Sequence, residues 1–127
     1  EEFWQKRPLL VKNAFPSFEE LSKSEIVKVL LDEEAESRLV RGGGHDSSDH
    51  SDWSLDFGPF DQKEISSVQN KTNAKNWTFL VNQANVHFPQ KMGKILSKFR
   101  FFPNWRIDDV MISQSGLNGG VGPHVDS

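Results

Sequence analysis

The sequence contains no cysteine, so neither a disulfide framework nor a thiolate metal site can form. It also lacks any apolar run near the roughly 20 residues that a transmembrane helix needs. The formal net charge is only -3, which gives no electrostatic case for binding nucleic acid or an anionic membrane. The first residues, Glu1-Glu2-Phe3-Trp4, have neither an initiating Met nor the pattern of a signal peptide. We therefore expect a soluble, cytoplasmic chain with an upstream segment missing.

The 127 residues suffice for one modest domain or for part of a larger one. Hydrophobic residues make up 35% of the chain and charged residues 26%, which is polar for a globular domain. Four Trp and ten Phe supply bulky side chains, and each buried ring removes a large area from water. We therefore expect a packed core rather than a disordered chain.

Helix and strand patterns are mixed along the chain without the regular alternation of βαβ units. A capping box at Ser22 precedes a helix that we expect near residues 23–34, and Pro89 is expected to open a second helix. Strand patterns are expected over residues 9–11, 37–41, 53–57, 77–83 and 105–115. Residues 42–52 read as a polar, glycine-rich loop, and residues 61–76 are ambiguous. The mixture predicts an α+β fold.

The most informative motif is His124-Val125-Asp126, near the end of the chain. In an extended segment, side chains two residues apart point to the same face, so His124 and Asp126 can hold one metal ion together. They make up two thirds of the 2-His-1-carboxylate triad that binds non-haem Fe(II) in oxygenases. The preceding run, Gly119-Gly120-Val121-Gly122-Pro123, allows a close backbone approach or a positive φ. From spacing and context alone, a metal pair and an ordinary surface turn are equally good interpretations.

The same spacing occurs in His50-Ser51-Asp52, which shows how easily it arises by chance. That copy lies in the polar loop, where nothing would fix the ring or the carboxylate. Four side chains of this loop could together bind Zn(II) or Ni(II), namely those of His45, Asp46, Asp49 and His50. A solvated loop is favoured there, because ordering a serine-rich segment costs entropy. For His87, between two apolar residues, a packed core or edge position is favoured over a ligand role.

Three blocks of the chain resemble segments of one family. Trp4-Gln5-Lys6-Arg7-Pro8 resembles the entry segment of the bacterial JmjC-type cupin Fe(II)/2-oxoglutarate oxygenases, and residues 76–82 resemble an intervening strand. Residues 105–113, followed by residues 119–126, are similar to the metal-binding segment of that family. Within the family, the match is greatest with the ribosomal oxygenases, which hydroxylate an arginine of a large-subunit ribosomal protein.

The resemblance implies a double-stranded β-helix (cupin) domain of which this chain is the N-terminal portion, with helices packed on the sheet. Residues 1–104 would form its mixed helix and strand part, and residues 105–127 its first metal-binding strand and loop. The resemblance also implies Fe(II), 2-oxoglutarate and O₂, with His124 and Asp126 as two of the iron ligands. The metal and the cosubstrate would carry out the oxidation, and the protein would bind and orient them.

Four further residues receive weaker assignments. Ser113 matches a position that faces the site and would contact cosubstrate or substrate; a local hydrogen bond on a strand is the equal alternative. Met111 has the same strand parity and could line the same pocket, although a core methionine is favoured. Asp108 and Asp109 could attract a substrate guanidinium. A solvated edge or a local salt bridge is the favoured alternative for this acidic pair.

In the family pattern, the third iron ligand and the basic residue that binds 2-oxoglutarate lie beyond Ser127. We therefore expect these 127 residues, made alone, to be inactive and prone to aggregate through open sheet edges. The expected partner of the full-length protein is a ribosomal protein, with no membrane and no direct nucleic-acid contact, and a homodimer is compatible with the family. Two alternatives remain open, a histidyl hydroxylase of the same family and a non-catalytic cupin-like binding module.

Overall fold

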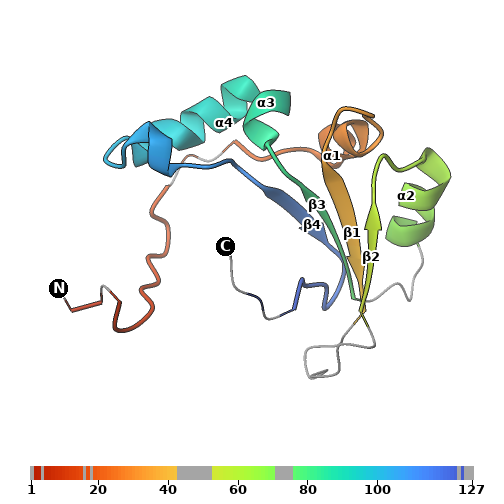
Figure 1. Cartoon of the computed structure of the whole chain (residues 1–127), viewed down its shortest axis with the longest axis horizontal. Coiled ribbons are helices and arrows are strands. Elements are labelled where there is room, and N and C mark those ends of the chain that lie inside the picture. The colour runs from red at the N-terminus through yellow and green to blue at the C-terminus, as the bar shows by residue number, and fades with distance from the viewer. Residues whose placement is uncertain are drawn as a thin grey trace.

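The computed structural model describes the whole chain except Glu1, Trp4, Pro16, Phe18, 43–52, 71–75, Pro123 and 125–127. Its centre is an antiparallel sheet with the strand order β2-β1-β3-β4 (Figure 1). The strands are β1 (Ser37–Arg41), β2 (Ser54–Phe57), β3 (Trp77–Val81) and β4 (Ile112–Ser115). The helices are α1 (Lys23–Leu30), α2 (Gln62–Asn70), α3 (Ala84–His87) and α4 (Pro89–Leu96), followed by the 3-10 turns η2 (Ser97–Phe99) and η3 (Asn104–Arg106). The predicted α+β class is confirmed.

β3 is the most deeply buried strand, since all five of its residues are buried. Trp77, Phe79 and Val81 alternate along it and therefore face the same side of the sheet. On that side they pack with apolar residues of α1, α2, β1 and the loops next to them, which are Ile26, Val29, Leu30, Ala35, Leu39, Phe60, Ile65 and Val68. This cluster is the core, and it fixes the strand to which β4 is hydrogen-bonded.

α1 begins where the capping box predicts. The backbone N–H of Glu25 donates to the Ser22 hydroxyl at 3.3 Å, and the backbone N–H of Ser22 donates to the Glu25 carboxylate at 2.8 Å. The expected continuation to residue 34 is wrong, because the helix ends at Leu30. Beyond it, the Asp32 carboxylate accepts the backbone N–H of Glu34 at 3.0 Å, and this local bond holds a turn in place of helix.

Two expectations about strands near the surface are wrong. Residues 9–11 form no strand, and Leu10 is 79% exposed. In the described part of the chain, no strand pairs with this run. β2 forms close to where it was predicted but is exposed on both faces rather than half-buried, with Phe57 69% exposed. It is an edge strand that pairs only with β1, so alternating apolar residues do not suffice to bury it.

The long strand predicted over residues 105–115 is also wrong over most of its length, because only Ile112–Ser115 is strand. The residues before it bond to the start of α3 instead: the backbone N–H of Ala84 donates to the Val110 carbonyl at 2.8 Å. The strand predicted over residues 77–83 ends at Val81, since Gln83 adopts φ 51°. The ambiguous stretch 61–76 contains α2. The boundary that we placed at residues 104/105 stays a prediction.

Candidate metal centre

The segment predicted to bind metal leaves the sheet at the end of β4 and is held there by the buried end of β3. The backbone N–H of Gly116 donates to the Trp77 carbonyl at 2.9 Å, and the backbone N–H of Asn76 donates to the Leu117 carbonyl at 2.9 Å. These two bonds extend the β3–β4 pairing into the loop. The first residues of the loop are therefore positioned by a strand that the core holds in place.

Two glycines of this loop have no room for a side chain. A Cβ added to Gly119 would lie 2.1 Å from the Trp77 carbonyl oxygen, and one added to Gly116 would lie 2.3 Å from the Trp77 indole nitrogen. The backbone thus passes directly against Trp77. Sequence reasoning assigned a close backbone approach to the run that contains Gly119, but it missed Gly116 and the part played by Trp77. A glycine immediately after the last strand residue was the available signal.

His124 lies two residues after a glycine in the left-handed conformation. Gly122 has φ +73°, a conformation that L side chains rarely adopt. The Nδ1 atom of His124 is 2.9 Å from the Gly122 carbonyl oxygen. A carbonyl oxygen can only accept, so Nδ1 carries the proton in this bond, and in the neutral ring the lone pair then lies on Nε2. Metal-binding histidines commonly donate their other ring N–H to a backbone carbonyl in this way.

Asp126, the predicted carboxylate partner of His124, lies outside the described residues. The alternative cluster of His45, Asp46, Asp49 and His50 lies outside them too. Within the described part of the chain, no three His, Cys, Asp or Glu residues converge on a common point. The metal pair therefore stays a prediction. One of its two donors, His124, contacts a backbone carbonyl oxygen through Nδ1, as metal-binding histidines commonly do.

Met111 and Ser113 are both exposed and line one open pocket of about 340 Å³. Their spacing of two residues predicts that they share one face of the approaching strand, and both line this pocket. Its other walls come from α1, α4 and the segment before α1, and they include Ile26, Met92 and Glu20. Met111 is 52% exposed, so the expectation of a core methionine is wrong.

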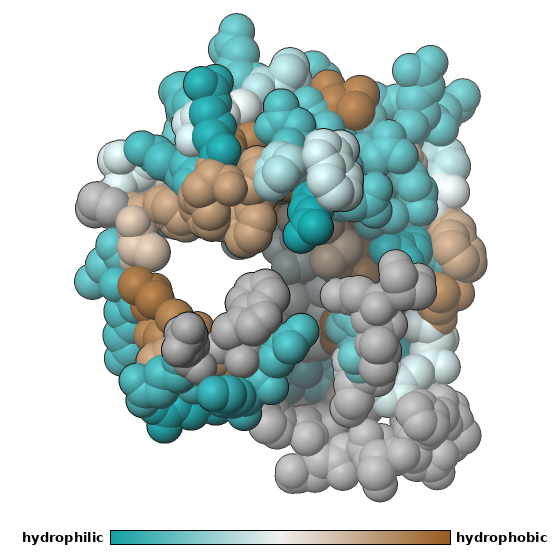
Figure 2. All heavy atoms as spheres, turned by 60° about the vertical axis from the view of Figure 1, so that its left-hand side comes forward, coloured by the Kyte–Doolittle hydropathy of each residue, from teal (hydrophilic) through white to brown (hydrophobic). Residues whose placement is uncertain are grey.

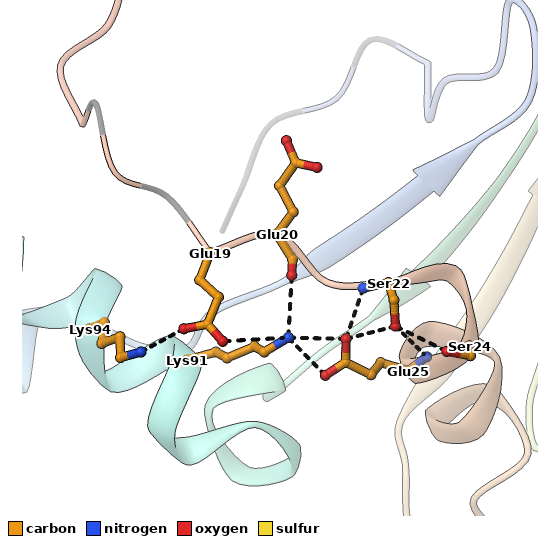
Figure 3. A network of polar contacts seen from close by, with 7 residues as sticks. All are labelled: Glu19, Glu20, Ser22, Ser24, Glu25, Lys91 and Lys94. Atoms are coloured by element: carbon orange, nitrogen blue, oxygen red, sulfur yellow. Dashed lines mark hydrogen bonds and ion pairs between the residues drawn. The ribbon is translucent and has the colours of Figure 1, made fainter.

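The wall formed by the segment before α1 is held in place by Lys91 of α4 (Figure 3). The Lys91 ammonium donates to the Glu20 carbonyl at 3.2 Å and to both oxygens of the Glu25 carboxylate, at 2.8 and 3.0 Å. Lys94, one turn further along α4, lies 2.5 Å from the Glu19 carboxylate. The two lysines thus join α4 to the segment that leads into α1, and Glu20 of that segment lines the pocket.

The two residues of the acidic pair Asp108-Asp109 differ in their hydrogen bonds. The Asp109 carboxylate accepts the backbone N–H of Gln83 at 2.8 Å and so stabilises the start of α3. Both residues of the pair line an open pocket of about 260 Å³ together with Arg100 and Asn104, and Asp108 is the more exposed of the two. A structural contact therefore accounts for Asp109, and a substrate role for either residue stays a prediction.

None of the helices in the described ranges has the length and hydropathy needed to span a bilayer. No protein-family model matches the chain. The ribosomal protein uL16 3-hydroxylase of Escherichia coli is 36% identical to it over 99% of this chain and 31% of its own length. The "Probable ribosomal oxygenase" of Haemophilus influenzae is 30% identical over 98% of this chain and 28% of its own.

Among solved structures, YcfD, a ribosomal oxygenase from Escherichia coli in complex with cobalt and 2-oxoglutarate, matches with a TM-score of 0.74 and 37% identity. That match covers 97% of this chain and 31% of the other. Sequence and fold together show that the chain is a homologue of the ribosomal oxygenases. It is homologous over nearly its whole length to Escherichia coli YcfD, and it spans about 31% of the length of that protein.

Proposed function

We propose that the whole protein carrying this chain is an Fe(II)- and 2-oxoglutarate-dependent dioxygenase of the JmjC cupin type that hydroxylates an arginine of the large-subunit ribosomal protein uL16. The homology to the Escherichia coli uL16 3-hydroxylase supports the substrate. The YcfD complex with cobalt and 2-oxoglutarate supports a divalent metal and this cosubstrate. The reaction is proposed to take place in the cytoplasm.

The observation that carries the proposal is the hydrogen bond between His124 and Gly122. A proton on Nδ1 in this bond supports Nε2 as the proposed donor to a metal, and Asp126 would supply a carboxylate oxygen. An imidazole nitrogen and a carboxylate form a donor set that suits non-haem Fe(II). When bound, the metal and 2-oxoglutarate supply the oxidising power of the reaction, and the chain supplies their orientation.

The pocket that contains Met111 and Ser113 would hold cosubstrate or substrate beside the metal ligands. Its apolar walls suit the alkyl part of either molecule, and the Ser113 hydroxyl can donate to or accept from a polar group. Asp108, which makes no hydrogen bond or ion pair with another described residue, is the carboxylate of the pair that can still receive a guanidinium.

The proposal is tested with the whole protein, Fe(II), 2-oxoglutarate and purified uL16. Mass spectrometry of the uL16 product should show one added oxygen atom on an arginine, and only when both Fe(II) and 2-oxoglutarate are present. An added oxygen on a histidine would replace the arginine assignment with the histidyl alternative. Intact uL16 without consumption of 2-oxoglutarate would contradict the enzymatic proposal and favour a binding module.

A further inference from the structure

The loop after β4 crosses the face of the sheet that lies opposite the core. Thr78 lies between Trp77 and Phe79, whose rings face the core, so its side chain faces away from the core. Strand pairing places one side chain of each strand in a row on that second face, namely Leu55, Val40, Thr78 and Ser115. The hydroxyl oxygens of Thr78 and Ser115 are 2.9 Å apart. A Cβ added to Gly119 would lie 3.0 Å from the Thr78 hydroxyl oxygen, so the first part of the loop is held above β3.

The far end of the loop reaches Trp53, the residue immediately before β2. A Cβ added to Gly122 would lie 3.4, 3.6 and 3.7 Å from three carbons of the Trp53 ring, which is van der Waals contact. Trp53 precedes Leu55 by two residues, so its ring points to the second face as well. It is half-buried, whereas all four residues of β2 are exposed. In Figure 1 the chain after β4 lies on the side of the sheet away from α2, and Figure 2 brings that side forward, with apolar brown atoms among hydrophilic teal ones.

Gly122 connects Trp53 to His124. The Gly122 carbonyl oxygen lies 2.9 Å from Nδ1 of His124, and the Trp53 ring covers the side of Gly122 on which a side chain would stand. Within the described part of the chain, residues 120–122 make no backbone hydrogen bond to the sheet. A Cβ added to Gly120 would meet no atom within 4 Å. The Trp53 ring therefore supports a part of the loop that the strand pairing does not hold. Both partners of this contact belong to the chain itself, so no exposed surface is involved.

We propose that Trp53 is a positioning residue for His124, an inference that rests on the proposed function of His124 as a metal ligand. A ring that lies against Gly122 limits where the Gly122 carbonyl can lie, and that carbonyl in turn orients the imidazole. Removing a contact behind a metal ligand commonly lowers metal affinity about 10–100-fold. An indole suits this place, because it offers a large rigid face and has only two rotatable bonds. A residue that only covered the edge of the sheet would affect stability but not the geometry of the metal site.

The test adds Co(II) to the metal-free whole protein and follows binding by visible absorption, which depends on the ligands of the metal and their geometry. Trp53→Leu keeps an apolar side chain but removes the ring, and it should weaken Co(II) binding about tenfold and alter the spectrum of the bound metal. Trp53→Phe keeps a shorter ring, and its affinity should fall between those of Trp53→Leu and the parent protein. Phe57→Leu, at a residue of β2 that is 69% exposed, is the matched control and should bind Co(II) as the parent does.

Circular dichroism of the metal-free proteins shows whether each variant is folded. The role of Trp53 is overturned if Trp53→Leu binds Co(II) with the affinity and spectrum of the parent, or if Phe57→Leu loses as much affinity. Should Trp53→Leu not fold, Trp53→Phe decides, and affinity and spectrum equal to those of the parent then overturn the inference. A parent protein that binds no Co(II) contradicts the proposed function and the role of Trp53 together. A parent protein that binds Co(II) while the Trp53 variants match it contradicts the role of Trp53 alone.

Discussion

The ammonium of Lys91 on α4 lies 2.8 Å from a carboxylate oxygen of Glu25 on α1. Glu25 is also the residue whose side chain closes the capping box at the start of α1. One carboxylate thus stabilises a helix end and joins two helices that line the same pocket. The pocket that we assign to cosubstrate or substrate therefore depends on a contact between residues 66 positions apart in the sequence.

The contact with Lys91 should make stability depend on pH in the acid range. The hydrogen bond from Lys91, followed by those from Ser22, lowers the pKa of Glu25 from 4.5 to about 2. In the unfolded chain the carboxyl takes up its proton at the higher pKa, so its contribution to stability is present above pH 4.5 and is lost as the pH falls toward 2. Denaturant unfolding between these values should show Glu25→Gln losing less stability on acidification than the parent protein. Glu33→Gln, at an exposed residue without a hydrogen bond or ion pair, is the control; equal pH slopes for the parent and Glu25→Gln would contradict the assignment.

Gly122→Ala should destabilise the loop that delivers His124. The residue has φ +73°, and a side chain in the left-handed region costs about 1–2 kcal/mol. Because the Gly122 carbonyl orients the His124 ring, Fe(II) affinity should fall as well. Gly120→Ala is the matched control, since its added Cβ would meet no atom within 4 Å and its φ is not in the left-handed region. If both variants bind Fe(II) equally well, the conformation of Gly122 does not position the His124 ring for the metal.

Gly119→Ala should be more damaging, because the added Cβ would lie 2.1 Å from a backbone oxygen that cannot rotate away. We expect a loss of about 1–3 kcal/mol in the free energy of unfolding, measured by chemical denaturation. Gly93→Ala offers the opposite case: its Cβ would meet nothing within 4 Å, and it lies inside α4. That variant should gain about 0.5–1 kcal/mol from helix propensity. A Gly119→Ala protein as stable as the parent would show that the loop does not pass against Trp77.

Ser113→Ala tests the pocket. Loss of one hydrogen bond to a bound molecule, worth about 1 kcal/mol, should raise the KM for 2-oxoglutarate or for uL16 about fivefold. The free energy of unfolding should not change, since Ser113 makes no hydrogen bond with a described side chain and is exposed. Ser67→Ala, at an exposed position of α2, is the control for the substitution itself. Unchanged KM values for both molecules would remove Ser113 from the site.

The sequence predicted best those elements whose signals are local. The capping box at Ser22 located the start of α1, and the run of apolar residues from Trp77 located β3, which the core then buries. It failed where burial depends on neighbours: the alternation around Leu55 and Phe57 indicated a half-buried strand, but β2 lies at an uncovered edge. The strand predicted from Trp105 failed because hydrogen bonds to the start of α3, such as that between Asp109 and Gln83, take its place.

The candidate site was predictable only in part. The glycine run before His124 distinguished it from His50 as a candidate ligand. The two-residue spacing of Met111 and Ser113 predicted that they share one face, and both line one pocket. The sequence did not indicate that Trp77 occupies the space beside Gly116 and Gly119, because that contact joins segments about 40 residues apart. Nor did it indicate that the ring of Trp53 lies against Gly122. Tertiary contacts of this kind carry no signature in a single sequence.

The measurement that tests the central claim most directly is Fe(II)-dependent turnover of 2-oxoglutarate by the His124→Ala variant of the whole protein. His87→Ala, which changes a histidine at the end of α3 that we do not assign to the metal, is the control. The account predicts that His124→Ala abolishes turnover while His87→Ala retains it. Turnover by His124→Ala at the rate of the parent protein would contradict the assignment of His124 as a metal ligand.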